Sequence, residues 1–155
     1  MSEVTSAARR SLLVIEDDPA LQTQMKWAFD AYDVALAAHF DEALAQLRRV
    51  EPAVVTLDLG LPPNTGGAGE GFRTLDRILE LAPDTKVIVV TGQHETANAR
   101  RAVAQGAYDF FAKPFDPAVV ALIIDRAFRM HELQTENRRL LAERTGSTNG
   151  IVTGA

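Results

Sequence analysis

The sequence contains no cysteine and few aromatic residues, which make up 6% of its 155 positions. Without cysteine, the protein can form neither a disulfide framework nor a thiolate metal site, and it suits a reducing compartment. No apolar run approaches the ~20 residues that a transmembrane helix needs. Residues 1–10 also lack the apolar stretch of a signal peptide. We therefore expect a cytoplasmic protein with no membrane partner.

Basic residues are outnumbered by acidic ones. Sixteen Lys and Arg stand against 21 Asp and Glu, which gives a formal net charge of −5. A domain that binds nucleic acid mainly through phosphate contacts needs the opposite balance, so we expect no direct nucleic-acid binding. Hydrophobic residues make up 46% of the chain, which excludes wholesale disorder and suits one domain with a substantial core.

Short apolar runs predict the strands. Each run is nearly continuous rather than alternating, which is typical of strands that are buried on both faces of a parallel sheet. Four runs are strong and a fifth is weaker, and they cover residues 12–15, 34–37, 54–57, 87–90 and 108–112.

Helical spacing of apolar residues separates these runs. Asp18 and Pro19 predict the start of a first helix, and Asp41 predicts the N-cap of a second. Further helices are expected over 72–79, over 94–105, and from Pro117 onward. Because strands and helices alternate five times, we predict an α/β protein with a doubly wound, five-stranded parallel sheet and right-handed crossovers.

The last helix is expected to be unusually long, since its pattern persists to about residue 143. Ile123, Met130 and Asn137 are seven residues apart, and Leu133 and Leu140 occupy the intervening heptad position. An Asn at such a position can fix the register and strand number of a coiled coil. Two interpretations are open: a core helix with a polar extension, or a helix that dimerises or transmits a signal. We favour the second, because Leu133 and Leu140 would otherwise project into water.

Polar residues follow four of the predicted strands. Glu16 and Asp17 follow the first, Asp58 the third, Thr91 the fourth and Lys113 the fifth. Ligands bind doubly wound sheets at the carboxyl ends of the strands, so these side chains should converge. Taken singly, each acid could be a helix cap or a turn residue. Their joint placement favours a functional site.

Carboxylates held this close together repel one another and raise one another's pKa. A hard divalent cation offsets that repulsion, and a site of oxygen ligands without His or Cys suits Mg²⁺. The ammonium group of Lys113 can offset it as well. Asp58 could then stay ionised and attack phosphorus as a nucleophile, with the cation and the lysine neutralising charge on the transferred group.

Four motifs resemble those of the receiver domain of two-component response regulators, over about residues 12–129. They are LLVIEDDP from Leu12, VVTLDLGLP from Val54, VIVVTG from Val87 and FFAKPF from Phe110. The resemblance implies a flavodoxin-like receiver fold that is not an enzyme toward other molecules, but a phosphoacceptor that assists its own phosphorylation and dephosphorylation.

The resemblance also implies roles for individual residues. Asp58 would accept a phosphoryl group from a sensor histidine kinase, while Lys113 and Thr91 would hold that group. Mg²⁺ would be bound by Asp17 and Asp58 directly, by the Gly60 carbonyl, and by Glu16 through water.

Thr91 and Phe110 would then act as the switch. Their movement would repack the surface formed by the helix over 94–105, the fifth strand and the last helix. The domains implied are a disordered N-terminus over 1–10, a receiver over 11–130, a linker or dimerisation helix over 131–144 and a disordered tail over 145–155.

Finer features are similar to the receivers of NtrC-like PEP-CTERM-box response regulators. They include DLGLPP before a glycine-rich insertion over 63–71, and HELQTENRRL after the receiver. This implies an output module with ATPase and DNA-binding parts, and the heptad pattern of the last helix leads us to expect a homodimer. The insertion is not a P-loop, because it lacks GxGxxG and no lysine follows.

Two other functions deserve comparison. A hydrolase of the haloacid-dehalogenase type also uses an aspartate at a strand end, but it would need an acid where this chain has Gly60. A pseudo-receiver would dimerise without phosphorylation, and the complete set of acidic, Thr and Lys residues argues against it. His39, His94 and His131 show no metal-ligand spacing and are expected on the surface.

Overall fold

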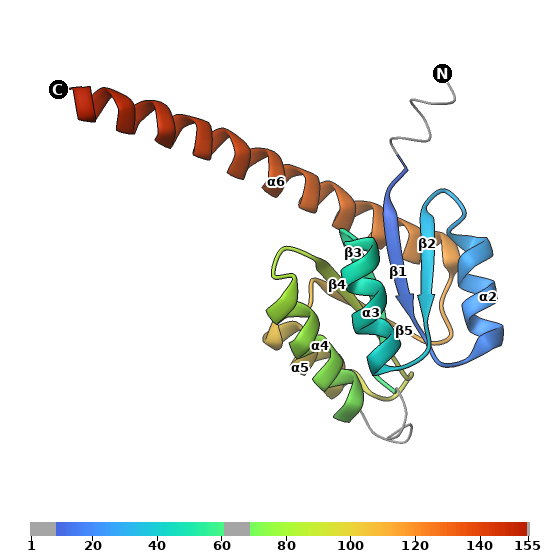
Figure 1. Cartoon of the computed structure of the whole chain (residues 1–155). Helices are drawn as coiled ribbons and strands as arrows, with labels where there is room; N and C mark the ends of the chain where they lie inside the picture. The colour runs from blue at the N-terminus through green and yellow to red at the C-terminus, as the bar shows by residue number, and fades with distance from the viewer. Residues whose placement is uncertain (1–8, 61–68, 155) are drawn as a thin grey trace.

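Five parallel strands form one sheet in the order β2-β1-β3-β4-β5 in this computed structural model (Figure 1). The structure describes residues 9–60 and 69–154, with side chains up to Arg144, so most of the predicted N-terminal tail and of the glycine-rich insertion lies outside the described residues. The strands are β1 (Ser11–Ile15), β2 (Asp33–Ala37), β3 (Val54–Asp58), β4 (Lys86–Thr91) and β5 (Asp109–Ala112). The predicted sheet is confirmed.

Helices cover both faces of the sheet (Figure 1). One core cluster joins Leu13, Val55 and Val87 to the helices α3 (Phe40–Val50), α4 (Gly69–Leu81) and α5 (Thr96–Gln105). The other joins Leu12, Val54 and Ile88 to α2 (Pro19–Ala28) and α6 (Pro117–Gly154). Alternate residues of each central strand therefore enter opposite cores, which explains why the strand sequences are apolar without alternation.

The start of α2 agrees with the prediction from the sequence, whereas the start of α3 does not. Asp18 caps α2 as expected, since its side chain accepts a hydrogen bond from the backbone N–H of Ala20, and Pro19 is the first helical residue. The predicted cap at Asp41 is wrong. His39 is extended and its Nδ1 accepts from the N–H of Glu42 at 3.3 Å, so α3 begins at Phe40. Asp41 lies in the first turn, where its charge suits the helix dipole.

Helix α5 is weakly anchored. Its buried residues are Ala99 and Ala102, whereas Val103 is 42% exposed. Two methyl groups remove much less apolar surface from water than the aromatic and aliphatic residues of the other helices. This agrees with the scarcity of large aliphatic residues in the sequence over 94–105.

Helix α6 packs on the sheet through Val120, Ile124 and Phe128 and then runs beyond it (Figure 1). The extension is tied to the domain by Arg138, which pairs with Asp84, and by Lys86, which donates to Gln134. The helix continues to Gly154, whereas the sequence predicted an end near residue 143 and a disordered tail. Propagation of an existing helix fixes one residue per hydrogen bond and is much easier than nucleation. Within the described part of the chain, no helix has the length and apolar character to cross a bilayer.

Candidate phosphoacceptor site

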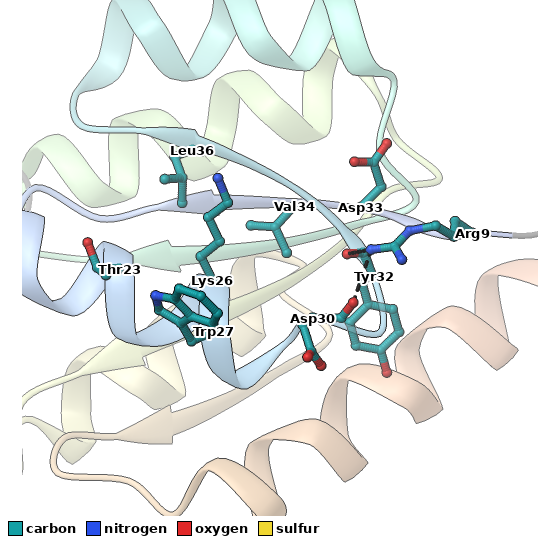
Figure 2. Close-up of a pocket in the computed structure, with 9 residues that line it drawn as sticks. All are labelled: Arg9, Thr23, Lys26, Trp27, Asp30, Tyr32, Asp33, Val34 and Leu36. Atoms are coloured by element: carbon teal, nitrogen blue, oxygen red, sulfur yellow. Dashed lines mark hydrogen bonds between the residues drawn. The ribbon is translucent and has the colours of Figure 1, made fainter. Parts of the chain in front are cut away.

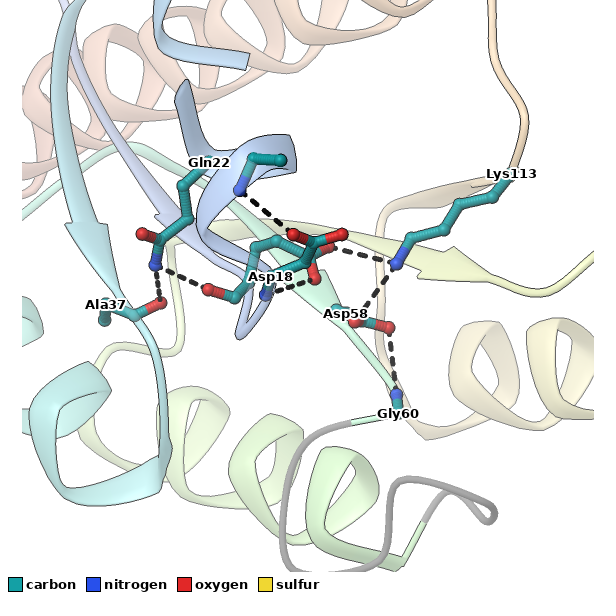
Figure 3. A network of polar contacts seen from close by, with 8 residues as sticks. Asp18, Gln22, Ala37, Asp58, Gly60 and Lys113 are labelled. Carbon is teal, nitrogen blue, oxygen red and sulfur yellow. Dashed lines mark hydrogen bonds and ion pairs between the residues drawn. The ribbon is translucent and has the colours of Figure 1, made fainter. Parts of the chain in front are cut away.

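The carboxyl ends of β1, β3, β4 and β5 bring the predicted polar residues to one edge of the sheet. Glu16, Asp17 and Asp58 each place a carboxylate oxygen within 4.8 Å of the others. They line a hollow of about 260 Å³ together with Gly60, Thr91 and Lys113 and three further residues, Asp18, Gly92 and Glu95. Figure 3 shows Asp58, Gly60 and Lys113 joined by polar contacts at this edge. The predicted convergence of these residues is confirmed.

Asp58 ends the most deeply buried strand, and it is 7% exposed. Its Oδ1 accepts a hydrogen bond of 2.9 Å from the backbone N–H of Gly60, and its Oδ2 lies 3.2 Å from Nζ of Lys113 (Figure 3). Both contacts direct a hydrogen-bond donor at the carboxylate, one from the backbone and one from a positively charged side chain. They also fix the direction in which it faces the hollow.

Glu16 is more deeply buried than Asp58, at 1% exposed. Its Oε2 accepts from the N–H of Asp18 at 3.2 Å, and its Oε1 lies 3.1 Å from Nζ of Lys113. That ion pair lacks hydrogen-bond geometry, so Oε1 has no hydrogen-bond partner among the described residues. Burial, and next the negative charge of Asp58, raise the pKa of Glu16 to about 8, while Lys113 acts in the opposite direction.

Lys113 supplies the positive charge of the hollow. Burial by itself lowers the pKa of this ammonium group, but the charges of Asp58 and Glu16 more than compensate and raise it above its usual value. The lysine therefore stays protonated. Its backbone N–H donates to the Thr91 carbonyl at 2.9 Å, which places β4 and β5 side by side at the site.

The acidic cluster fits a divalent cation. The candidate ligands are oxygen atoms, which hard cations such as Mg²⁺ prefer. The buried Oε1 of Glu16 has no hydrogen bond among the described residues, and the raised pKa of this group reflects its burial and then the charge of Asp58, which one lysine does not fully offset. Glu16, Asp17 and Asp58 are thus the residues that would hold the ion.

The remaining predicted residues are placed as follows. Thr91 is buried beside the hollow, whereas Phe110 is 39% exposed and is not among the lining residues. On α6, Met130, Leu133 and Leu140 have exposed side chains, as does Asn137. Ile123 differs, because it is half-buried and packs against the domain's own core.

Two features were not predicted from the sequence. The first is Glu95, which lines the hollow although none of the four motifs contains it. Its position at the start of a predicted helix, shortly after Thr91, is the sequence feature that could have indicated it. The second is the position of Trp27, which lines a separate hollow beside the edge strand β2 with Arg9 and Lys26 (Figure 2). Trp27 follows Asp18 by nine residues on a helix, about 13 Å along its axis, so it does not adjoin the acidic cluster.

Comparisons with known proteins agree with this geometry. The sequence model of the response regulator receiver domain matches residues 12–125. The chain is 31% identical to the C4-dicarboxylate transport transcriptional regulatory protein DctD of Rhizobium meliloti, over 94% of this chain and 31% of that protein. It is 29% identical to the nitrogen assimilation regulatory protein NtrX of Azorhizobium caulinodans, over 83% of this chain and 28% of that protein.

Solved structures show the same fold. The crystal structure of NtrX from Brucella abortus aligns with a TM-score of 0.77 and 27% identity, covering 85% of this chain and 29% of that one. A CheY-like receiver domain protein from Methanospirillum hungatei aligns with a TM-score of 0.73 and 26% identity, covering 82% of this chain and 99% of that one. The chain spans about a third of the length of DctD and NtrX. It belongs to the response regulator receiver domain family, and it is a receiver of two-component systems similar to those of NtrX and DctD.

Proposed function

We propose that Asp58 accepts a phosphoryl group from a sensor histidine kinase with Mg²⁺ bound at the acidic cluster. The observation that carries this proposal is the position of the Lys113 ammonium group, 3.2 Å from Asp58 and 3.1 Å from Glu16 at one end of the sheet. A buried aspartate lies there beside an ammonium group that is able to bind phosphoryl oxygens. No catalysis on a separate substrate is proposed, since the domain assists only its own phosphorylation and dephosphorylation.

The transfer follows from these contacts. A carboxylate oxygen of Asp58 attacks phosphorus, a P–O bond forms, and the P–N bond to the kinase imidazole breaks with its electron pair leaving on nitrogen. Lys113 neutralises charge on the transferred group, and the Thr91 hydroxyl donates to one of its oxygens. Glu16 and Asp17 would hold Mg²⁺ with Asp58, and the bound ion would supply charge neutralisation and fix the geometry of the phosphoryl oxygens.

Phosphorylation is proposed to change the surface formed by α5, β5 and α6. The phosphoryl group adds about −1.5 to −2 charge beside Thr91, which draws this side chain inward. Phe110 then turns inward to occupy the space that the Thr91 side chain leaves. The weak anchoring of α5 through Ala99 and Ala102 makes it the element whose position changes at least cost.

The extension of α6 is proposed to link this switch to dimerisation and to an output module. Among the described side chains of α6, the large exposed apolar residues are Val119, Leu122, Met130, Leu133, Leu140 and Leu141. At about 100° per residue they fall on one side of the helix, as a dimer seam requires. The relatives DctD and NtrX are longer regulatory proteins, which supports an output module beyond this domain, and this module is proposed to have ATPase and DNA-binding parts. We place the chain in the cytoplasm among NtrC-like PEP-CTERM-box regulators.

Intact-mass spectrometry with acetyl phosphate and Mg²⁺ tests the proposal. The protein should gain the mass of one phosphoryl group, and Asp58→Asn should gain none. Asp30→Asn is a matched control, since Asp30 is exposed at the end of α2 and should leave labelling unchanged. Full labelling of Asp58→Asn would exclude Asp58 as the acceptor.

A pseudo-receiver that dimerises without phosphorylation is the second candidate. The exposed apolar seam of α6 favours it as much as it favours a phosphorylated dimer. Light scattering with and without beryllofluoride separates the two. A dimer that forms equally in both states, together with no Mg²⁺ binding by calorimetry, would support the pseudo-receiver.

A further inference from the structure

Glu95 occupies the N-cap position of α5 but does not cap the helix. Its side chain makes no hydrogen bond to the backbone N–H groups of the first turn. It lines the acidic hollow instead, and one carboxylate oxygen accepts from the side-chain amide of Asn98 at 3.3 Å. A fifth carboxylate therefore stands at the rim of a site that must admit a phosphodonor.

Gly92 makes this position possible. A Cβ atom at residue 92 would lie 2.9 Å from Oε1 of Glu95 and 3.3 Å from its Cδ. The first of these distances is shorter than non-bonded contacts allow, so an alanine at this position would push the flexible Glu95 side chain away. Gly92 directly follows Thr91, the residue proposed to contact the phosphoryl group. The Glu95 carboxylate is thus held next to the place where negative charge arrives.

The charges around the hollow are unbalanced. Five carboxylates line it, those of Glu16, Asp17, Asp18, Asp58 and Glu95, and one ammonium group, that of Lys113, opposes them. The first four lie on the elements that would hold Mg²⁺. Glu95 instead occupies the N-cap position of α5 and is exposed, so its charge acts on incoming anions rather than on the buried cluster.

We propose that Glu95 is a carboxylate at the rim of the hollow that slows phosphorylation of Asp58 by small anionic phosphodonors. The lack of a side chain at Gly92 leaves the space that the Glu95 carboxylate occupies. This inference rests on the proposed phosphoacceptor role of Asp58. With acetyl phosphate, the bond from phosphorus to the acetyl oxygen breaks as the Asp58 carboxylate bonds to phosphorus, and acetate leaves with the electron pair. Glu95 takes no part in these bonds, but it repels the donor during approach.

The test compares phosphorylation rates of four variants with that of the wild type at fixed Mg²⁺ and low salt. Glu95→Gln should react with acetyl phosphate roughly fivefold faster, as expected when one partly screened charge is removed at short range. Gly92→Ala should show a similar increase by displacing Glu95, and the double variant should be no faster than Glu95→Gln. Glu143→Gln, which removes an acid from α6 instead, should match the wild type.

Two further readouts separate repulsion from a structural effect. The increase in phosphorylation rate of Glu95→Gln over the wild type should shrink as the salt concentration rises. This increase should also be smaller with phosphoramidate, which carries less negative charge than acetyl phosphate. The urea midpoint of Glu95→Gln should match that of the wild type. Equal or slower labelling of Glu95→Gln overturns the rim role alone. Failure of every variant and of the wild type to take up phosphate overturns both this inference and the proposed function.

Discussion

The ammonium nitrogen of Lys113 lies 3.1 Å from Oε1 of Glu16, a carboxylate oxygen that accepts no hydrogen bond within the described residues. Lys113, in the loop after β5, thus places a positive charge beside the buried carboxyl group of Glu16 at the end of β1. The lysine is shared with Asp58, so it compensates each carboxylate only in part. This incomplete compensation has consequences for stability, phosphoryl transfer and metal binding.

Stability without metal should fall as pH rises. The pKa of Glu16 is about 8 in the folded protein and 4.5 in its ordinary state. Between these values the folded protein binds a proton that the unfolded chain has released, so the free energy of unfolding decreases with pH. We expect urea midpoints measured in EDTA to decline from about pH 5 to pH 8. Glu16→Gln should flatten this decline, since its amide has no charge, and an unchanged slope would argue against the raised pKa.

Removal of the Lys113 ammonium should impair phosphorylation without preventing folding. Lys113→Met leaves Asp58 in place but removes the cation that neutralises the transferred group, so we expect the rate with acetyl phosphate to fall roughly 100-fold. Lys86→Met is the matched control, because Lys86 contacts Gln134 on α6 rather than the hollow. Wild-type rates in Lys113→Met would show that the lysine does not act on the phosphoryl group.

Asp17→Asn should weaken Mg²⁺ binding, because an amide replaces one of three clustered carboxylates. Isothermal titration calorimetry is the suitable measurement. Tryptophan fluorescence is not, since Trp27 is 75% exposed beside the separate hollow at β2 (Figure 2). Asp41→Asn serves as the control acid at the start of α3. Equal affinities for the wild type and Asp17→Asn would remove Asp17 from the proposed ligand set.

A charge on the apolar side of α6 should prevent dimerisation. Leu133 is 65% exposed in the single chain, and Leu133→Glu would place a carboxylate in the seam of a coiled coil. Light scattering with beryllofluoride should then give the mass of a monomer. Thr135→Glu adds the same charge about 200° around the helix and should still dimerise. If both variants dimerise, the contact between subunits lies elsewhere.

The sequence by itself determined the sheet and the composition of the site. Nearly continuous apolar runs identify buried parallel strands because each strand must be apolar on both faces, and parallel pairing then places Asp17, Asp58, Thr91 and Lys113 at one edge. These inferences use only local periodicity and chain order. The cap of α3 was misassigned because Asp41 and His39 can both accept a hydrogen bond from the backbone, and packing of Phe40 beneath the guanidinium group of Arg73 accompanies the earlier start.

Tertiary structure alone decided the electrostatics and the surroundings of the site. That Glu16 is buried with an unbonded oxygen depends on how closely Lys113 approaches from a distant part of the chain. The orientation of Glu95 over Gly92 depends on the backbone between β4 and α5. The exposure of Leu133, and the half-burial of Ile123 in the same heptad pattern, depend on where α6 leaves the sheet. Distances of a few ångströms between residues far apart in sequence set these properties, and no local pattern encodes them.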